Sequence, residues 1–308
     1  MPRSRTPRPA LRALAGALPR RRRLPLRGST VLITGGASGI GRLMALGAAR
    51  RGAARVVVWD LDLSAAEAVA AEARALGAEA VAERVDVTDA AAVEAAAARA
   101  GAVDVAVNNA GVVTGARLED ATEEGIRRTF DVNALAPYWL TRAVLPGMKA
   151  RDRGAVVVIA SAAGLVGVAR QTDYSATKHA AVGFAESLSA ELRKDGSAVT
   201  ALAVCPFYID TGMFDGVRSR IPWLLPVLRQ EEVAEQVLDA VEAGRTRLPL
   251  PRAVGLLAPL RALPTPVFDR AMDLMGVNDT MDGFTGRRPA VDVPAPDPRV
   301  FAPDGAAR

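Results

Sequence analysis

Short apolar runs alternate with amphipathic stretches along most of the chain. The runs are rich in Val and Ile at consecutive positions, as in strands buried on both faces of a parallel sheet. They occupy residues 29–35, 54–60, 80–87, 103–111, 154–161 and 198–206. Between them lie helical patterns such as residues 64–76, where Ser64 is the predicted N-cap and Glu67 follows three positions later. This rhythm predicts an α/β fold with a single doubly wound parallel sheet and helices on both faces.

The two ends of the chain break this rhythm. Residues 1–27 hold nine arginines and no acidic residue, which predicts a basic arm that is disordered or lies on an anionic membrane surface. Residues 286–308 are rich in proline and charge and predict a disordered tail. We therefore expect one domain over residues 28–285.

Charge and composition narrow the function classes. The net charge of +5 falls to −4 when the nine arginines of the arm are left out, so the folded part has no excess of cations and we expect no nucleic-acid partner. One cysteine and one histidine leave a disulfide or a structural zinc site without enough ligands, and we expect no metal. No apolar run reaches the roughly 18–20 residues of a membrane-spanning helix. We expect a cytoplasmic protein, with peripheral membrane contact as an open alternative.

A glycine-rich turn follows the first predicted strand. Residues 34–41 read Thr-Gly-Gly-Ala-Ser-Gly-Ile-Gly and precede a predicted helix. Gly35, Gly39 and Gly41 would let the backbone approach a pyrophosphate, which the N–H groups of the helix N-terminus would bind. The spacing of these glycines differs from the common G-x-G-x-x-G pattern, but the position between first strand and first helix indicates a Rossmann-type dinucleotide site.

An acidic residue closes the second predicted strand. Asp60 stands about 20 residues beyond the glycine turn, where a carboxylate hydrogen-bonds the adenosine ribose hydroxyls. A carboxylate there repels the extra phosphate of NADP, and its neighbours Trp59 and Leu61 offer no cation. The sequence therefore predicts NAD rather than NADP. The alternatives are that Asp62 takes the ribose role or that Asp60 is only a solvated strand end.

Tyr174 and Lys178 stand four residues apart, on one face of a predicted helix. A phenol titrates near 10, and a neighbouring ammonium group favours its ionised form. We expect Tyr174 to exchange a proton with a substrate hydroxyl or carbonyl oxygen.

These motifs together resemble the short-chain dehydrogenase/reductase family. The glycine turn, Asn108-Asn109-Ala110-Gly111, Ser161, Tyr174 and Lys178 occur in the family's order, and the resemblance covers about residues 29–215. It implies that Ser161 hydrogen-bonds the substrate oxygen, that Lys178 binds the nicotinamide ribose, and that Asn133 holds a water in a proton relay. The positions that match cofactor-binding residues of the family are Thr34, Gly35, Ser38, Gly39, Ile40, Gly41, Asp60, Asp86, Asn108, Ala110, Gly111, Tyr174, Lys178, Pro206, Ile209 and Thr211.

One departure from the family pattern concerns the substrate. The family commonly has Pro-Gly after the strand that ends at Pro206, whereas this chain has Phe207. With Ser161, the residues expected to form the substrate pocket are Phe207, Tyr208, Met213 and Phe214. The segments 205–214 and 275–287 resemble the retinol dehydrogenase and 17β-hydroxysteroid dehydrogenase branch, which implies a retinoid, steroid or long-chain alcohol as substrate. The apolar residues of 207–228 would cover such a substrate, or equally form core or a subunit interface.

Several alternatives stay open at this point. The apolar, proline-rich segment 248–268 fits a membrane surface or a partner subunit. We expect a homo-oligomer, a dimer or tetramer. A reductase of small ketones or ketoacyl thioesters is the second enzymatic hypothesis, and an NAD(H)-binding regulator without turnover is the third.

Overall fold

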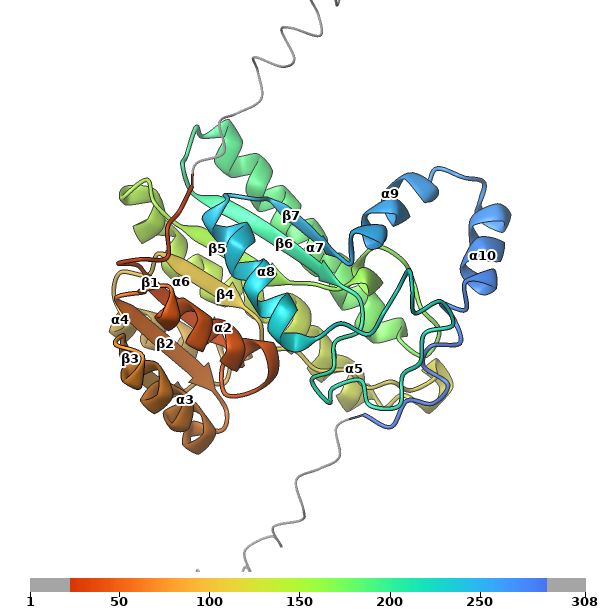
Figure 1. The fold of residues 1–308 in the computed structure, drawn as a ribbon, viewed down its shortest axis with the longest axis horizontal. Coiled ribbons are helices and arrows are strands. Elements are labelled where there is room, and N and C mark those ends of the chain that lie inside the picture. Colours follow the sequence, from red (N-terminus) through yellow and green to blue (C-terminus); the bar gives the residue numbers. More distant parts are fainter. Residues whose placement is uncertain (1–22, 287–308) are drawn as a thin grey trace, which may run out of the picture.

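The structure is a computed structural model that describes residues 23–286 of the chain. Most of the predicted basic arm and nearly all of the predicted tail lie outside these residues. The described part folds around one sheet with helices on both faces, as Figure 1 shows. The predicted doubly wound Rossmann-type α/β fold is therefore confirmed.

Seven strands pair in parallel in the order β3-β2-β1-β4-β5-β6-β7. The order reverses between β1 and β4, so the loops that follow these two strands diverge and open a crevice, which is where doubly wound sheets bind ligands. The strands are β1 (Thr30–Thr34), β2 (Arg55–Asp60), β3 (Glu79–Arg84), β4 (Val105–Asn108), β5 (Ala155–Ile159), β6 (Thr200–Pro206) and β7 (Arg247–Leu250).

The seventh strand was not predicted. Its sequence, Arg-Leu-Pro-Leu, contains Pro249, which lacks the N–H group that a central strand needs. The strand lies at the edge of the sheet, where this loss is tolerated, and it buries Leu248 and Leu250. The first residues of the segment 248–268 therefore belong to the sheet, and the predictions of a membrane or subunit contact are wrong for them.

Side chains of the strands alternate between two apolar cores. Val31, Ile33 and Val58 face one core, whereas Leu32 and Val57 face the other. Helices α2, α3 and α8 complete the first core, and α4, α6 and α7 complete the second. Because both faces are covered, the ends of the strands are the part of the sheet left for a ligand.

The helices have the following bounds: α2 (Gly39–Arg50), α3 (Leu63–Ala75), α4 (Ala90–Ala100), α5 (Glu123–Phe130), α6 (Ala136–Ala150), α7 (Thr172–Lys194), α8 (Gln230–Glu242), α9 (Leu257–Leu260) and α10 (Thr265–Leu274). A single π-helical turn, Asp131–Leu135, joins α5 to α6. None of the described helices has the length and apolarity needed to cross a bilayer.

The N-cap predicted for the helix after β2 is wrong by two residues. Asp62, not Ser64, caps α3, and its Oδ1 accepts a hydrogen bond from the Ala65 N–H at 3.0 Å. Aspartate is among the best N-cap residues, and here it starts the helix one residue before the predicted stretch. Asp62 therefore has a structural role as the N-cap of α3, which Asp60 does not share.

The folded part also begins earlier than predicted. Leu24 and Leu26 are buried in the first core, and the Leu26 N–H donates to Glu242 Oε1 at 3.1 Å. Only every second residue of 24–27 is apolar, and the surrounding arginines hid this short pattern in the sequence. The predicted arm of residues 1–27 is wrong for its last residues, because the domain includes them.

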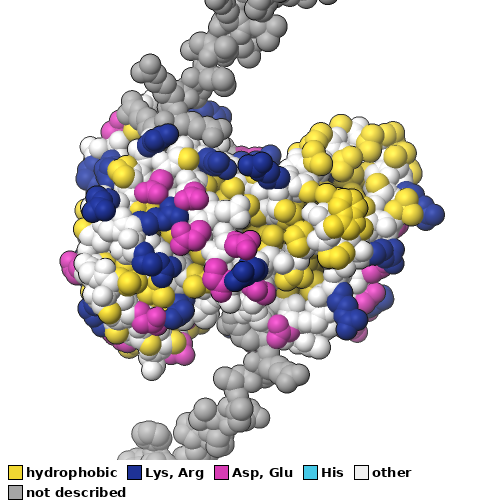
Figure 2. Space-filling view, in the orientation of Figure 1, with side chains coloured by type: hydrophobic (Ala, Val, Ile, Leu, Met, Phe, Trp, Pro, Cys, Tyr) yellow, Lys and Arg dark blue, Asp and Glu magenta, His cyan; other side chains and the backbone are white. Residues whose placement is uncertain are grey.

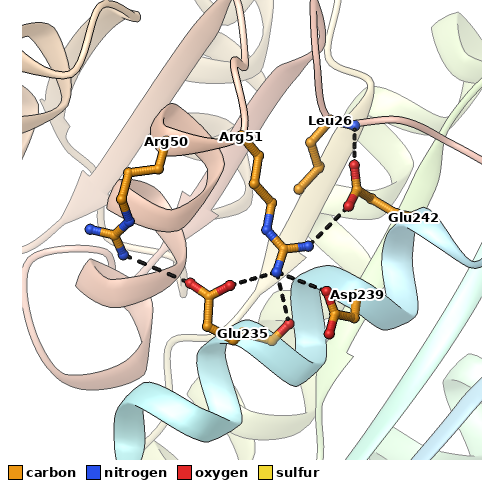
Figure 3. A network of polar contacts seen from close by, with 6 residues as sticks. All are labelled: Leu26, Arg50, Arg51, Glu235, Asp239 and Glu242. Atoms are coloured by element: carbon orange, nitrogen blue, oxygen red, sulfur yellow. Dashed lines mark hydrogen bonds and ion pairs between the residues drawn. The ribbon is translucent and has the colours of Figure 1, made fainter.

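A charged network ties this N-terminal segment to α2 and α8 (Figure 3). Arg51, directly after α2, donates to Glu235 at 2.5 Å and to Glu242 at 2.9 Å, and it lies 2.8 Å from Asp239. Three carboxylates converge on one guanidinium group whose side chain is only 20% exposed. Arg51 therefore offsets the mutual repulsion of the three acids.

We predict that Arg51→Met lowers the free energy of unfolding by about 1–2 kcal/mol, because it leaves these acids without their shared cation. Arg50→Met is the matched control. Arg50 is 51% exposed and lies 3.8 Å from Glu235, so its loss should change the stability by less than about 0.5 kcal/mol. Urea denaturation measures both, and equal effects of the two variants would contradict the prediction.

Candidate active site

A cleft of about 1090 Å³ runs along the carboxyl ends of the strands. Each of five strands contributes a residue at or just beyond its end, namely Gly35, Asp60, Ala110, Ser161 and Pro206. Strands far apart in the sequence thereby build one site at the reversal point of the sheet.

Most of the residues predicted from the sequence line this cleft. They are Gly35, Ser38, Gly39, Ile40, Gly41, Asp60, Asp86, Ala110, Gly111, Ser161, Tyr174, Lys178, Pro206, Phe207, Tyr208, Ile209, Thr211, Met213 and Phe214. The structure thus brings the glycine turn, the acidic strand end, the tyrosine and the aromatic segment to one cavity.

Glycine is required at different positions of the turn for different physical reasons. Gly39 has φ +52°, in the left-handed region, and lies against the Thr211 side chain. A Cβ on Gly41 would lie 2.2 Å from the Gly35 carbonyl oxygen and 2.6 Å from Asn109 Nδ2. Gly41 is therefore needed for packing inside the turn, and its role in the close approach of a pyrophosphate stays a prediction.

The start of α2 fits an anionic group. Ser38 precedes the helix, and its side chain caps no N–H group among the residues that the structure describes. The first N–H groups of this 12-residue helix therefore stay available, and the helix dipole adds partial positive charge there. Such an end is suited to a pyrophosphate.

Asp60 lies at the cleft and also holds the turn. Its Oδ2 accepts from the Ala37 N–H at 3.0 Å and its Oδ1 from the Asp62 N–H at 3.1 Å. These bonds fix the carboxylate at the end of β2 while leaving its remaining lone pairs free to accept. Asp86, beyond β3, accepts from Thr88 through Oδ1 and lies in the same part of the cleft.

Two of the predicted cofactor residues lie behind the cleft wall. Thr34 Oγ1 accepts from the N–H groups of Asn109 and Ala110 at 3.0 and 3.1 Å. Asn108 donates to the Val157 carbonyl at 3.4 Å. Asn109 of the same motif lines the cleft and donates to the carbonyls of both Thr34 and Gly35. These contacts lock β4 to the glycine turn.

Asn133 also acts on the protein itself. It lies in the π-helical turn, where its Oδ1 accepts from the Val112 N–H at 2.9 Å and its Nδ2 donates to the Val112 carbonyl at 2.8 Å. Nδ2 also lies 3.2 Å from Thr177 Oγ1. The side chain thus fixes the loop after β4 against α7, and the water relay stays a prediction.

Tyr174, Lys178 and Ser161 meet in the middle of the cleft. Tyr174 and Lys178 lie on successive turns of α7, and the ammonium nitrogen is 5.5 Å from the centre of the phenol ring. Lys178 Nζ donates to the Ile159 carbonyl at 2.9 Å, which fixes α7 to the end of β5. Ser161 follows β5 directly, and its Oγ accepts from the Ala163 N–H at 3.1 Å.

Burial changes the pKa values of two of these groups. Burial raises the pKa of the Tyr174 phenol, and its hydrogen bond with Ser161 offsets only part of that rise. Burial also lowers the pKa of Lys178 to about 8. Burial therefore favours the neutral phenol and opposes the predicted effect of Lys178, which stays a prediction.

Aromatic rings form the wall beside Tyr174. Phe214 stands edge-on to Tyr174 with ring centres 5.7 Å apart, and Tyr208 lies 5.0 Å from Phe214. Phe207 packs 4.6 Å from Tyr208, so the residue that departs from the family pattern does line the cleft.

The far wall of the cleft was not predicted residue by residue. It comes from apolar residues of the segment 248–268, predicted as a membrane or subunit contact, and of the segment 275–287, which resembles the retinol dehydrogenase and 17β-hydroxysteroid dehydrogenase branch. They are Val254, Leu256, Leu257, Leu260, Met275 and Val277. Helices α9 and α10 stand out from the sheet at this end of the molecule (Figure 1).

Comparisons with known proteins agree with this geometry. The family model described as short chain dehydrogenase matches residues 29–222. Human epidermal retinol dehydrogenase 2 is 38% identical over 286 residues, covering 90% of this chain and 92% of that protein. Mouse 17-beta-hydroxysteroid dehydrogenase 13 is 35% identical over 241 residues, covering 77% of this chain and 78% of that protein.

A solved structure is similar as well. The crystal structure of a short chain dehydrogenase/reductase from Burkholderia phymatum, in complex with NAD, has a TM-score of 0.70 and 28% identity. It covers 78% of this chain and 94% of that chain. The resemblance to the retinol and 17β-hydroxysteroid dehydrogenase branch is confirmed, and the chain belongs to the short-chain dehydrogenase/reductase family of oxidoreductases.

Proposed function

We propose that this protein is an NAD(H)-dependent oxidoreductase that interconverts a hydroxyl and a carbonyl group on a lipophilic substrate. The observation that carries the proposal is the meeting of Tyr174, Ser161 and Lys178 in the cleft that also holds the glycine turn. The apolar far wall and the names of the similar retinol and 17-beta-hydroxysteroid dehydrogenases support a retinoid, a steroid or a long-chain alcohol.

The cleft offers a separate contact for each part of the dinucleotide. The start of α2 would bind the pyrophosphate, Asp60 the adenosine ribose, and Asp86 the adenine amino group. Lys178, Ile209 and Thr211 lie on the side of the cleft where the nicotinamide and its ribose would bind. When bound, the cofactor supplies or accepts the hydride.

Asp60 favours NAD over NADP. Its carboxylate is held in place by the Ala37 and Asp62 N–H groups at the end of β2. An extra phosphate on the ribose would bring like charges together there, which is unfavourable in a partly buried site. The NAD complex of the similar Burkholderia phymatum protein supports the same choice.

Asp60→Ala should reduce the preference for NAD over NADP, measured as the ratio of kcat/KM values, by about tenfold or more. Asp62→Ala is the matched control, since it removes a carboxylate two residues away that caps α3. The control should lower stability and leave the cofactor ratio unchanged. An unchanged ratio in Asp60→Ala would assign the discrimination to another residue.

Tyr174 would exchange the proton. Because burial raises the pKa of its phenol, Tyr174 is protonated at neutral pH and carries the proton that a carbonyl oxygen would receive during reduction. In the oxidative direction, the positive charge of the oxidised nicotinamide would favour loss of the proton. Ser161, beside the phenol, would donate a hydrogen bond to the same substrate oxygen.

Tyr174→Phe should lower kcat by at least about 100-fold while leaving NADH binding within about twofold, because only the hydroxyl is lost. Tyr138→Phe is the control, since Tyr138 is exposed on α6. Coupled NAD⁺ reduction and NADH fluorescence titration measure the two quantities. Normal turnover in Tyr174→Phe would refute the assigned role.

A substrate panel separates the remaining hypotheses. We expect retinoids, steroids or long-chain alcohols to be oxidised with higher kcat/KM than small alcohols, because the far wall is apolar. Preference for small ketones or ketoacyl thioesters would favour the second hypothesis. NADH binding without any turnover would favour a regulator. The homo-oligomeric state stays a prediction.

The projecting apolar residues support peripheral membrane contact. Trp223 is 82% exposed, and Val267 and Leu274 of α10 are exposed as well. Figure 2 shows apolar side chains gathered over the α9 and α10 end of the molecule, beside the far wall of the cleft. A lipid-soluble substrate could then enter from the bilayer.

Flotation with vesicles of anionic phospholipid at low salt tests this contact. The protein should float with the vesicles, and Leu274→Glu should reduce the bound fraction several-fold. Leu76→Glu, at an exposed leucine after α3, is the control and should bind like the natural protein. A protein that stays wholly in the soluble fraction, or a control that loses binding equally, would contradict the proposal.

A further inference from the structure

A chain of three buried polar side chains crosses the apolar wall of the cleft. Gln171 Nε2 donates to the Tyr208 hydroxyl at 3.3 Å. The Tyr208 hydroxyl lies 2.8 Å from Thr280 Oγ1, which donates to the Val277 carbonyl at 2.8 Å. Each side chain donates to the next. Gln171 donates to Tyr208, Tyr208 to Thr280, and Thr280 to a backbone carbonyl.

The two ends of this hydrogen-bonded series, Thr280 and Gln171, differ in the hydrogen bonds that they can still form. Thr280 is buried away from the cleft, and its one hydroxyl proton is donated to the Val277 carbonyl. Gln171 is only 1% exposed and lines the cleft. Within residues 23–286, no hydrogen bond reaches its carboxamide oxygen, and one of its two amide hydrogens is left over. A buried amide with spare capacity on a ligand cavity is suited to bind a polar group of the ligand.

The position of Gln171 relative to Tyr174 determines which part of a ligand it can contact. It directly precedes α7, three residues before Tyr174, which corresponds to about 4.5 Å along a helix axis. The Tyr208 ring, on which its amide depends, is linked to Tyr174 through Phe214. A group bound by Gln171 would therefore lie close to the carbon that reacts at Tyr174.

We propose that Gln171 is a specificity-determining residue that recognises a second oxygen, a hydroxyl group, within a few carbons of the reacting carbon of the substrate. The inference rests on the proposed function, since Tyr174 defines the reacting end. Tyr208 and Thr280 act as positioning residues that hold the amide in place. The preferred substrate is then a lipophilic compound with two neighbouring oxygen functions, not a plain alcohol with one.

A series of ketones of one chain length tests this specificity. The series consists of a 12-carbon ketone without a further oxygen and ketones that carry a hydroxyl two, four or eight carbons from the carbonyl. The natural protein should reduce one of the two near-spaced hydroxyketones with about tenfold higher kcat/KM than the plain ketone. The eight-carbon spacing should bring no advantage.

Gln171→Met keeps the size of the side chain and removes its hydrogen bonds. It should raise KM for the preferred hydroxyketone about tenfold and leave kcat/KM for the plain ketone within about twofold. Thr280→Val is the matched control for a purely structural role, because it breaks the same chain outside the cleft. It should reduce the preference only in part.

Three results would overturn the inference. The natural protein could turn over the series without preferring any spacing, or Gln171→Met could lose activity equally on all ketones. Thr280→Val could match Gln171→Met in both the melting temperature and the kinetics, which would indicate a structural role. Failure of the proposed function is a different result, since the natural protein would then bind NADH and reduce no member of the series or of the substrate panel.

Discussion

The need to cover both faces of a parallel sheet determines the arrangement of this protein. Successive residues of each strand face opposite cores, so helices must pack on both sides and leave the strand ends as the accessible part of the sheet. Glycines, acids and hydroxyl groups that are distant in sequence meet at those ends. The cleft is therefore a consequence of how the sheet is buried, and its side chains are held by elements that the core itself fixes.

Burial has a second effect within the cleft. It favours the neutral form of both Tyr174 and Lys178, so the two groups change in opposite directions relative to their usual pKa values. Within the described part of the chain, the ammonium group donates to the Ile159 carbonyl and no acidic side chain binds it. In the proposed function, the charge of a bound cofactor would add to these effects of burial and would link cofactor binding to proton transfer.

The sequence predicted the elements whose signal is local. Six strands were recognisable because each contains a short apolar run, and many site residues were recognisable because they follow those strands. Tyr174 and Lys178 were recognisable by their spacing on a helix. The features that the sequence did not predict depend on tertiary structure. Pro249 hid the strand β7, and the surrounding arginines hid the packing of Leu24 and Leu26. The raised pKa of Tyr174 depends on its depth of burial, which no motif records. Gln171 and Thr280 carry no local signal, since they meet only through Tyr208.

Pro249 has a consequence for the outer edge of the sheet. The Thr246 carbonyl accepts from Ala203 of β6, and the Leu250 carbonyl accepts from Phe207, directly after β6. In the alternation of a parallel strand, the backbone of Pro249 therefore faces away from the sheet. The donor that proline lacks is thus missing on the side that a further strand would have to approach. An eighth strand, whether from the same molecule or from a neighbour, would find an incomplete ladder there, and the edge is protected against unwanted growth.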